Sequence, residues 1–517
     1  MERQKVIILD FGSQTTQLIA RRVREIGAYC EILPCHITLS ELKTAAPSAI
    51  ILSGGPASVD GDGAPQLMHG ILDLQIPILG ICYGMQLLAK ELGGRVHHAS
   101  KREFGRAPIH ILGNSALFAN IPSRIDVWMS HGDQVEEMPS SFACVAKSET
   151  CAFVAFEDRE RRIYGVQFHP EVFHSQFGKE VLENFVINIA GMKADWKMAS
   201  FLDEETLHIK DTVGDKHVLM ALSGGVDSSV AAALIHRAIK DQLHCVYVNH
   251  GLQRSGELAE IQSIFQELLH LNLKVVDAEE EFLNALAGIT DPEQKRKVVG
   301  RTFIEVFERE SKKIEGISFL GQGTLYPDVV ESVSAHGGPS AVIKSHHNVG
   351  GLPERMHLKL IEPLRQLFKD EVRVLGEQLG LPNRLVHRQP FPGPGLSIRI
   401  IGEVNKTRCD LLRKADAIVR EEIDAAREQG KLSKNLWQWF AVLLPVRTVG
   451  VMGDGRTYGE TIAVRCCEST DGMTADFAHI PHELLAVISN RIINEVHGIS
   501  RVVYDISSKP PSTIEWE

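Results

Sequence analysis

A cysteine framed by glycines is the first feature of the sequence that could do chemistry. In GICYGMQ (residues 80–86), Cys82 lies two positions from Gly80 and from Gly84, at the end of an apolar run. Glycines allow a tight turn from strand to helix, and such a turn lifts the middle side chain out of the sheet. The turn also directs the positive end of the helix at the sulfur, which favours the reactive thiolate. The pattern predicts a nucleophilic cysteine.

A base and a group that orients it are expected at the same sheet edge. Another apolar run ends in FHPE (168–171), which supplies His169 and Glu171. Because parallel strands end at one edge of a sheet, His169 could meet Cys82 there, and Glu171 could hold the second imidazole nitrogen. The three side chains would then form a cysteine–histidine–glutamate triad.

Backbone donors for an oxyanion are also available. A third apolar run ends in ILSGGP (51–56), so the N–H groups of Gly55 and Tyr83 could face a developing negative charge. Taken singly, a cysteine in a strand is usually a core residue, and a His-Pro-Glu sequence is usually a surface turn. Their joint occurrence at three strand ends favours catalysis over these structural explanations.

The motifs GGP, GICYGMQ and HPE together resemble the class I glutamine amidotransferases. The resemblance implies that Cys82 attacks the side-chain amide of glutamine, forms a γ-glutamyl thioester and releases ammonia, after which water releases glutamate. Gln86 and the SHGD run (130–133) match positions that contact glutamine in that family.

A second glycine-rich turn follows the apolar run HVLMAL. Small residues there would expose backbone N–H groups to an anion at a helix N-terminus. The turn lacks the Gly-Lys-Ser/Thr ending of a Walker A loop and is not GxGxxG. A structural alternative is a turn whose Asp and Ser only cap the helix. The residues are Ser223, Gly224, Gly225, Val226, Asp227, Ser228 and Ser229.

This SGGVDSS form resembles the PP-loop of ATP pyrophosphatases. The resemblance implies that the loop holds the β,γ-diphosphate of ATP, that attack falls on the α-phosphorus, and that the substrate is adenylated. Asp227 is then a candidate Mg²⁺ contact. Mg²⁺ with ATP is the expected cofactor, without a prosthetic group.

Two further polar segments stand out. The loop IKSHHNVGGLPE (343–354) carries Lys344 and an adjacent histidine pair, which we interpret as a substrate-covering loop and not as a metal site. The last segment, SSKPPSTIEWE (507–517), is stiffened by two prolines and carries Trp516, which predicts a docked end. An ordinary structural tail is the alternative.

The elements that position these residues alternate as short apolar runs and helical segments, which predicts an α/β multidomain chain. A new strand-to-turn signature at residues 217–225 begins a second series, and the Pro- and Gly-rich stretch 388–399 ends it. The remainder mixes a helix (407–429) with strand-like runs and is α+β. We therefore predict three domains, with residues 1–197, 198–392 and 393–517.

Composition narrows the class of protein. The chain has 517 residues, too many for one core, and its formal charge of −11 argues against a nucleic-acid coat. The chain has nine cysteines, an odd number, which favours reduced thiols in a cytoplasm. No CxxC pair indicates a zinc site. Cys466 and Cys467 are expected in the core. The chain has no run of 18 apolar residues, so a membrane span is not expected.

Order and motifs over essentially the whole chain resemble the glutamine-hydrolysing GMP synthetases, in their shorter, prokaryotic-type form. The resemblance implies a flavodoxin-like amidotransferase domain, a PP-loop domain of the adenine-nucleotide α-hydrolase type and a C-terminal dimerisation domain. ATP would adenylate the 2-oxygen of xanthosine 5′-monophosphate (XMP), and ammonia would displace AMP to give GMP, the last step of de novo GMP synthesis. Arg254, Lys509 and Glu515 match XMP-site positions, and Lys344 lies in the covering loop.

Other classes are less consistent with the residues. Glutamine-using asparagine synthetases carry an N-terminal cysteine, whereas Cys82 is internal, and NAD synthetases usually pair this loop with another glutaminase. A tRNA-thiolating enzyme would need more catalytic cysteines and a basic face. A non-catalytic relative would be expected to lack Cys82, His169 or Asp227, and all three are present.

Overall fold

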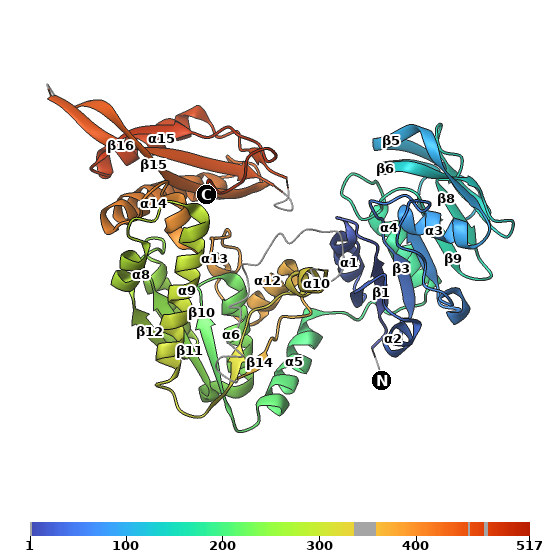
Figure 1. Cartoon of the computed structure of the whole chain (residues 1–517), viewed down its shortest axis with the longest axis horizontal. Helices are drawn as coiled ribbons and strands as arrows, with labels where there is room; N and C mark the ends of the chain where they lie inside the picture. The colour runs from blue at the N-terminus through green and yellow to red at the C-terminus, as the bar shows by residue number, and fades with distance from the viewer. Residues whose placement is uncertain (1–2, 335–357, 453–454, 470–473) are drawn as a thin grey trace. The chain divides into compact units, whose positions relative to one another are not determined.

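The computed structural model describes residues 3–334, 358–452, 455–469 and 474–517 (Figure 1). Its described residues divide into two compact units. The first unit contains the described residues of 1–201 with residues 327–334, and the second contains residues 202–326 with those of 358–517.

The first unit is built on a nine-stranded sheet whose first five strands in spatial order are parallel and whose remaining strands pair antiparallel. The central strands are continuous apolar runs because helices cover both faces of such sheets. In spatial order the strands are β2 (Cys30–Pro34), β1 (Val6–Asp10), β3 (Ala49–Leu52), β4 (Ile78–Ile81), β9 (Ile163–Val166), β8 (Ala155–Asp158), β7 (Ala143–Lys147), β5 (Arg95–Ile111) and β6 (Arg124–Glu137).

The helices of this unit follow the parallel strands along the chain. Helix α2 begins with a capping box in which Thr38 and Glu41 satisfy each other's backbone N–H groups. The helices are α1 (Thr16–Glu25), α2 (Leu39–Thr44), the 3₁₀ turn η1 (Leu72–Leu74), α3 (Tyr83–Glu91) and α4 (Gly178–Glu183), which continues as the π-helical η2 (Asn184–Ile189).

The second unit begins with a five-stranded parallel sheet in the order β12–β11–β10–β13–β14, against which α6 and α9 pack (Figure 1). Asp291 caps α9, and Pro292 occupies its first turn. The strands are β10 (His217–Leu222), β11 (Leu243–Asn249), β12 (Asn272–Asp277), β13 (Ile317–Gly321) and β14 (Lys359–Ile361). The helices are α5 (Met198–Val213), α6 (Val226–Ile239), η3 (Lys240–Gln242), α7 (Glu257–Gln262), η4 (Ser263–Leu268), α8 (Glu279–Leu286), α9 (Pro292–Ser311), α12 (Lys369–Gln378) and α13 (Asn383–Val386). Helix α10 (Tyr326–Ser334) lies between β13 and β14 along the chain, but all of it except Tyr326 belongs to the first unit.

A four-stranded sheet with helices completes the second unit. Its two long strands form an antiparallel hairpin, which extends past the neighbouring helices in Figure 1. The elements are η5 (Gly395–Arg399), α14 (Lys406–Glu428), β15 (Leu436–Met452), β16 (Gly455–Glu468), β17 (Asp476–Phe477), α15 (His482–Glu495) and β18 (Ile499–Tyr504).

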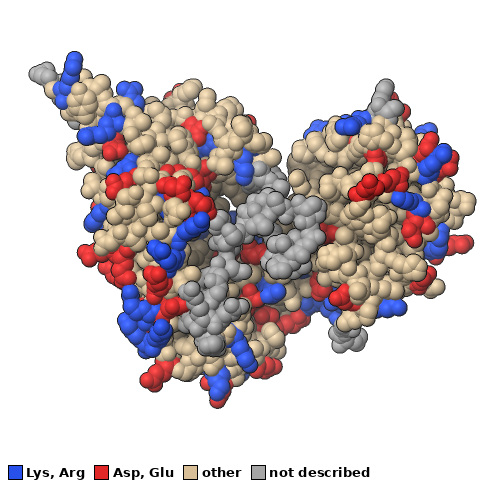
Figure 2. Space-filling view, viewed as in Figure 1, with Lys and Arg blue, Asp and Glu red and all other residues tan. Residues whose placement is uncertain are grey.

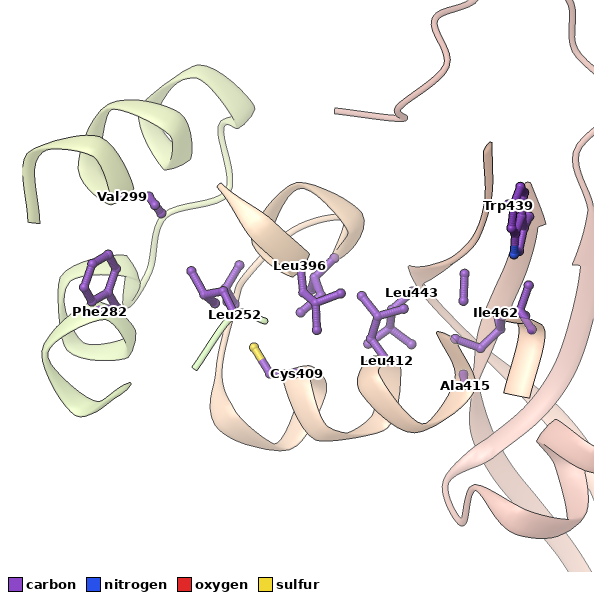
Figure 3. Packing of buried hydrophobic residues seen from close by; sticks show 14 of the residues in the cluster. Leu252, Phe282, Val299, Leu396, Cys409, Leu412, Ala415, Trp439, Leu443 and Ile462 are labelled. Carbon is purple, nitrogen blue, oxygen red and sulfur yellow. The ribbon is translucent and has the colours of Figure 1, made fainter. Parts of the chain in front are cut away.

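A large hydrophobic core runs through much of the second unit (Figure 3). It joins side chains before residue 393, such as Leu252 and Phe282, to later ones, such as Leu412 and Ile462. The first predicted domain boundary, after residue 197, lies close to the division between the two units. The second, after residue 392, falls inside this shared core, and the three-domain description stays a prediction.

The predicted multidomain α/β fold is confirmed, and the apolar runs that lead into ILSGGP, GICYGMQ, FHPE and SGGVDSS are the strands β3, β4, β9 and β10. The sequence interpretation missed α5, the antiparallel strands β5 to β8 and the long strand β15. Cys466 and Cys467 are fully buried in β16, as expected of core residues.

Candidate active sites

The turn between β4 and α3 has the form expected of a nucleophile elbow. Cys82 has φ = 51°, a left-handed conformation that costs about 1–3 kcal/mol outside glycine. A Cβ atom on Gly84 would lie 2.5 Å from the Leu52 carbonyl oxygen, and one on Gly80 would lie 2.6 Å from the backbone of Gly84. The Cys82 N–H donates to the Val166 carbonyl at 2.8 Å. Only glycines at these two positions let the strand and helix approach closely enough to hold the turn.

The structure brings the three predicted side chains together. His169 Nδ1 lies 2.7 Å from Glu171 Oε1, and both side chains are buried. Burial disfavours the imidazolium, but the Glu171 carboxylate and a hydrogen bond with the Cys82 thiol outweigh burial and raise the pKa of His169 well above its usual value. A thiol, an imidazole and a carboxylate in this order can generate a thiolate nucleophile.

Two neighbours of the sulfur were not singled out individually from the sequence. Gln167 Nε2 donates to Cys82 Sγ at 3.6 Å, and Sγ lies 3.8 Å from the Ser130 carbonyl oxygen. Gln167 directly precedes FHPE, and Ser130 begins the SHGD run, so their places beside known motifs were the available signal.

The candidate oxyanion donors flank the elbow. Neither the Gly55 N–H nor the Tyr83 N–H has a hydrogen-bond partner among the described residues. A Cβ on Gly55 would lie 2.8 Å from the Phe11 carbonyl oxygen. The Tyr83 hydroxyl donates to Pro65 at 2.6 Å, and burial raises its pKa to about 12. The two free backbone donors can therefore serve a ligand.

The Gln86 side chain is turned toward the protein. Its amide nitrogen donates to the Asp133 carbonyl at 2.8 Å and to Gln167 Oε1 at 3.3 Å, and the residue is buried. Gln86 thus ties α3 to β6 and to the neighbour of the sulfur. A direct contact with glutamine stays a prediction.

The SGGVDSS motif follows β10 directly, as predicted, with residues 223–225 in the turn and residues 226–229 in the first turn of α6. Gly224 has φ = +73°, and a Cβ there would lie 2.9 Å from Glu257 Oε1. The hydroxyls of Ser228 and Ser229 donate to the Gly225 carbonyl at 3.1 and 2.7 Å. Gly225 provides no side-chain cap, so the first N–H groups of a 14-residue helix face outward and can bind an anion.

Lys369 faces Asp227 in the same turn. Its ammonium lies 2.7 and 2.6 Å from the two Asp227 oxygens, and the Asp227 side chain is 31% exposed. A partly open carboxylate with a cation already against both oxygens, at an anion-binding helix end, fits a magnesium ligand. Lys369 lies far along the chain, and nothing in the sequence linked it to Asp227.

Arg254 lies in a buried cluster of charges. Its Nε is 3.8 Å from Asp416 Oδ2, and its guanidinium lies 4.4 Å from the centre of the Phe391 ring. Burial lowers its pKa to about 9, and two of its buried nitrogens, Nε and Nη2, have no hydrogen-bond partner among the described residues. Arg399, which also faces Phe391, donates to both oxygens of Glu515 at 2.9 and 2.7 Å.

The predicted docked tail is confirmed. Trp516 Nε1 donates to Asp505 at 2.9 Å, and the backbone of Lys509 pairs with that of Ala475. Glu515 accepts hydrogen bonds from Arg399, and Arg399 and Arg254 both face the Phe391 ring. Among the described residues, no contact connects Lys509 with Arg254. Lys344 and the rest of its loop lie outside the described residues.

Comparison with known proteins assigns the family. The profile of class-I glutamine amidotransferase matches residues 7–189, that of NAD synthase residues 200–300 and that of the GMP synthase C-terminal domain residues 425–516. A protein of Aquifex aeolicus named GMP synthase [glutamine-hydrolyzing] is 56% identical over 517 residues and covers 100% of both chains. One of Phenylobacterium zucineum with the same name is 58% identical and covers 100% of this chain and 99% of its own.

The chain belongs to the glutamine-hydrolysing GMP synthase family. The family resemblance drawn from the motifs is thereby confirmed, together with an amidotransferase domain and an ATP-pyrophosphatase type of domain. For this GMP synthase family member, no helix of the described residues is long and apolar enough to span a membrane. Within the same residues, no group of three or more His, Cys, Asp or Glu side chains forms a metal site.

Proposed function

We propose that this chain converts XMP to GMP with ATP and glutamine, and that its two units divide the work. The observation that carries the proposal is the pairing, on one chain of the GMP synthase family, of a buried Cys82–His169–Glu171 triad with an uncapped glycine turn at Gly225. The triad suits amide hydrolysis, and the turn suits a diphosphate.

In the first unit, Cys82 would attack the side-chain carbonyl of glutamine as a thiolate. The N–H groups of Gly55 and Tyr83 would receive the oxyanion, and His169 would give its proton to the leaving ammonia. Water, deprotonated by His169, would then hydrolyse the thioester and release glutamate. Glu171 would hold the imidazole throughout.

In the second unit, the 223–229 turn would bind the β,γ-diphosphate of ATP through backbone N–H groups and hydroxyls. Asp227 would hold Mg²⁺, which when bound neutralises charge on the diphosphate. The 2-oxygen of XMP would attack the α-phosphorus and pyrophosphate would leave. Ammonia would then add at C2 and AMP would depart.

XMP would bind at the charge cluster around Arg254. A buried guanidinium with two nitrogens that make no hydrogen bond among the described residues is costly unless a ligand satisfies it, which supports a phosphate or ribose contact. We assign Lys509 to the phosphate end and Glu515 to the same nucleotide, with Lys344 in a covering loop.

We further propose a cytoplasmic homodimer formed through the C-terminal domain. The β15–β16 hairpin exposes Val449, Val451 and Tyr458, which is unusual for a strand pair without a partner. Basic and acidic side chains are mixed on the face drawn in Figure 2, so a nucleic-acid partner is not expected.

Two substitutions test the division of labour. Cys82→Ala should abolish GMP formation from glutamine while GMP formation from ammonia continues, whereas Asp227→Ala should stop both reactions. AMP and pyrophosphate should appear in equal amounts only when XMP is present. Release of ADP and orthophosphate, or loss of the ammonia reaction in Cys82→Ala, would refute the proposal.

A further inference from the structure

A fully buried lysine lies away from both sets of reacting groups. Lys295, in the first turn of α9, has a side chain that is 0% exposed. Its ammonium donates to three oxygens: the Ser397 carbonyl at 3.2 Å, the Ile400 carbonyl at 2.7 Å and Glu517 Oε2 at 2.5 Å. It therefore joins α9 to the segment around η5 and to the tail of the chain.

Only one of these three partners carries a charge. Burial lowers the pKa of Lys295, and the hydrogen bond and charge of Glu517 oppose that shift. A buried ammonium without its carboxylate is strongly unfavourable, so the lysine holds Glu517 in place. The next residue, Arg296, adds a hydrogen bond to the Glu517 main-chain carbonyl.

The held residue is two positions from Glu515. Glu515 gives both oxygens to Arg399, and Arg399 shares the Phe391 ring with Arg254. A shift of Glu517 would therefore move Glu515 relative to the unpartnered Arg254 nitrogens. Lys295 can affect this cluster only indirectly, because its hydrogen bonds within the described part of the chain go to Ser397, Ile400 and Glu517 and not to Arg254 or Glu515.

We propose that Lys295 is a positioning residue that fixes the tail, through Glu517, in the place where Glu515 meets the nucleotide. The inference rests on the proposed function, because it assigns the tail to the XMP site. A lysine that only stabilised the fold would affect the KM values for ATP and XMP alike, so the two roles can be distinguished.

The test compares Lys295→Met and Glu517→Gln with Lys297→Met, an exposed lysine on the same helix. Ammonia-dependent synthesis is measured at saturating ATP, and hydrogen exchange is followed in the peptides covering residues 507–517. Lys295→Met and Glu517→Gln should each raise the KM for XMP about tenfold, with kcat and the KM for ATP within about twofold of wild type. Their tail peptides should exchange faster, and Lys297→Met should behave as wild type.

The double variant should raise the KM for XMP no more than either single variant, because both remove one interaction. If Lys295→Met does not fold, Glu517→Gln decides alone, since it leaves the carbonyl contacts of Lys295 in place. An unchanged KM for XMP, an equal rise in the KM for ATP, or unchanged tail exchange would overturn the inference. Failure of the wild-type enzyme to use XMP would instead refute the proposed function. The exchange data would still show whether the contact between Lys295 and Glu517 holds the tail in place.

Discussion

At the scale of single residues, the protonation of His169 is controlled by a neighbouring carboxylate. It is buried, which disfavours its charge, yet Glu171 at 2.7 Å raises its pKa well above 6.5. Its protonation therefore stabilises the folded state fully below a pH of about 6.5, and this contribution is lost as the pH rises through the raised value.

Replacing Glu171 with glutamine should lower the pKa of His169. Burial would remain and the negative charge would be removed, so the imidazole of His169 should titrate at a lower pH in Glu171→Gln than in the wild type, although the contact with Cys82 still favours the imidazolium. Glutaminase turnover should fall about 10³-fold, because the imidazolium and its orientation lose support. Carbon-13 labelling of histidine Cε1 and NMR titration measure the pKa directly.

The His169→Gln variant identifies the signal in those spectra. If the His169 resonance titrated at the same pH with and without the Glu171 carboxylate, the charge pair would not be the cause of the shift.

At the scale of elements, the elbow depends on close approach between a strand and a helix. Of the two elbow glycines, Gly84 has the less space, because any Cβ there would overlap Leu52. Gly84→Ala should lower the stability of the first unit by about 1–3 kcal/mol and abolish glutaminase activity, leaving ammonia-dependent synthesis intact.

Thermal unfolding and the two activity assays measure these effects. Gly300→Ala is the matched control, because a Cβ at this helical glycine meets no atom within 4 Å. An active, stable Gly84→Ala enzyme would show that the turn tolerates movement.

The elements that the sequence predicted are those with unbroken apolar runs, such as VIILD in β1 and HVLMAL in β10. The 17-residue strand β5 was not predicted, because its sequence is mostly polar. Strand β6 does alternate buried and exposed positions, so its period of two was a usable signal. Helix α5 was not predicted, because its charged residues suggested a linker.

The same distinction applies to the sites. Cys82, His169 and the glycine turn lie in short motifs, where neighbours in sequence are neighbours in space. Lys369 and Lys295 act through contacts 142 and 222 residues away, to Asp227 and Glu517. No local spacing encodes such pairs, because tertiary packing alone brings them together.

At the scale of the whole molecule, the second unit should unfold as one body, because its core is continuous. Leu412→Ala, in α14, should lower the stability of the whole second unit by about 2–5 kcal/mol. Calorimetry should show one transition moving to lower temperature while that of the first unit stays in place.

Leu88→Ala, in the core of the first unit, should move the other transition. A separate transition for residues 393–517 in Leu412→Ala would show that the core does not couple the two parts.

The shared core also limits how the gene for this chain can be divided. A fragment ended after residue 392 would lose Leu396, Leu412 and Leu443, and would leave Leu252 and Phe282 facing water (Figure 3). Such a piece would be prone to aggregate however intact its nucleotide loop. Exchange of parts between relatives, or expression of the ammonia-consuming half alone, is therefore better attempted by severing the chain just before α5, which begins at Met198, than after residue 392.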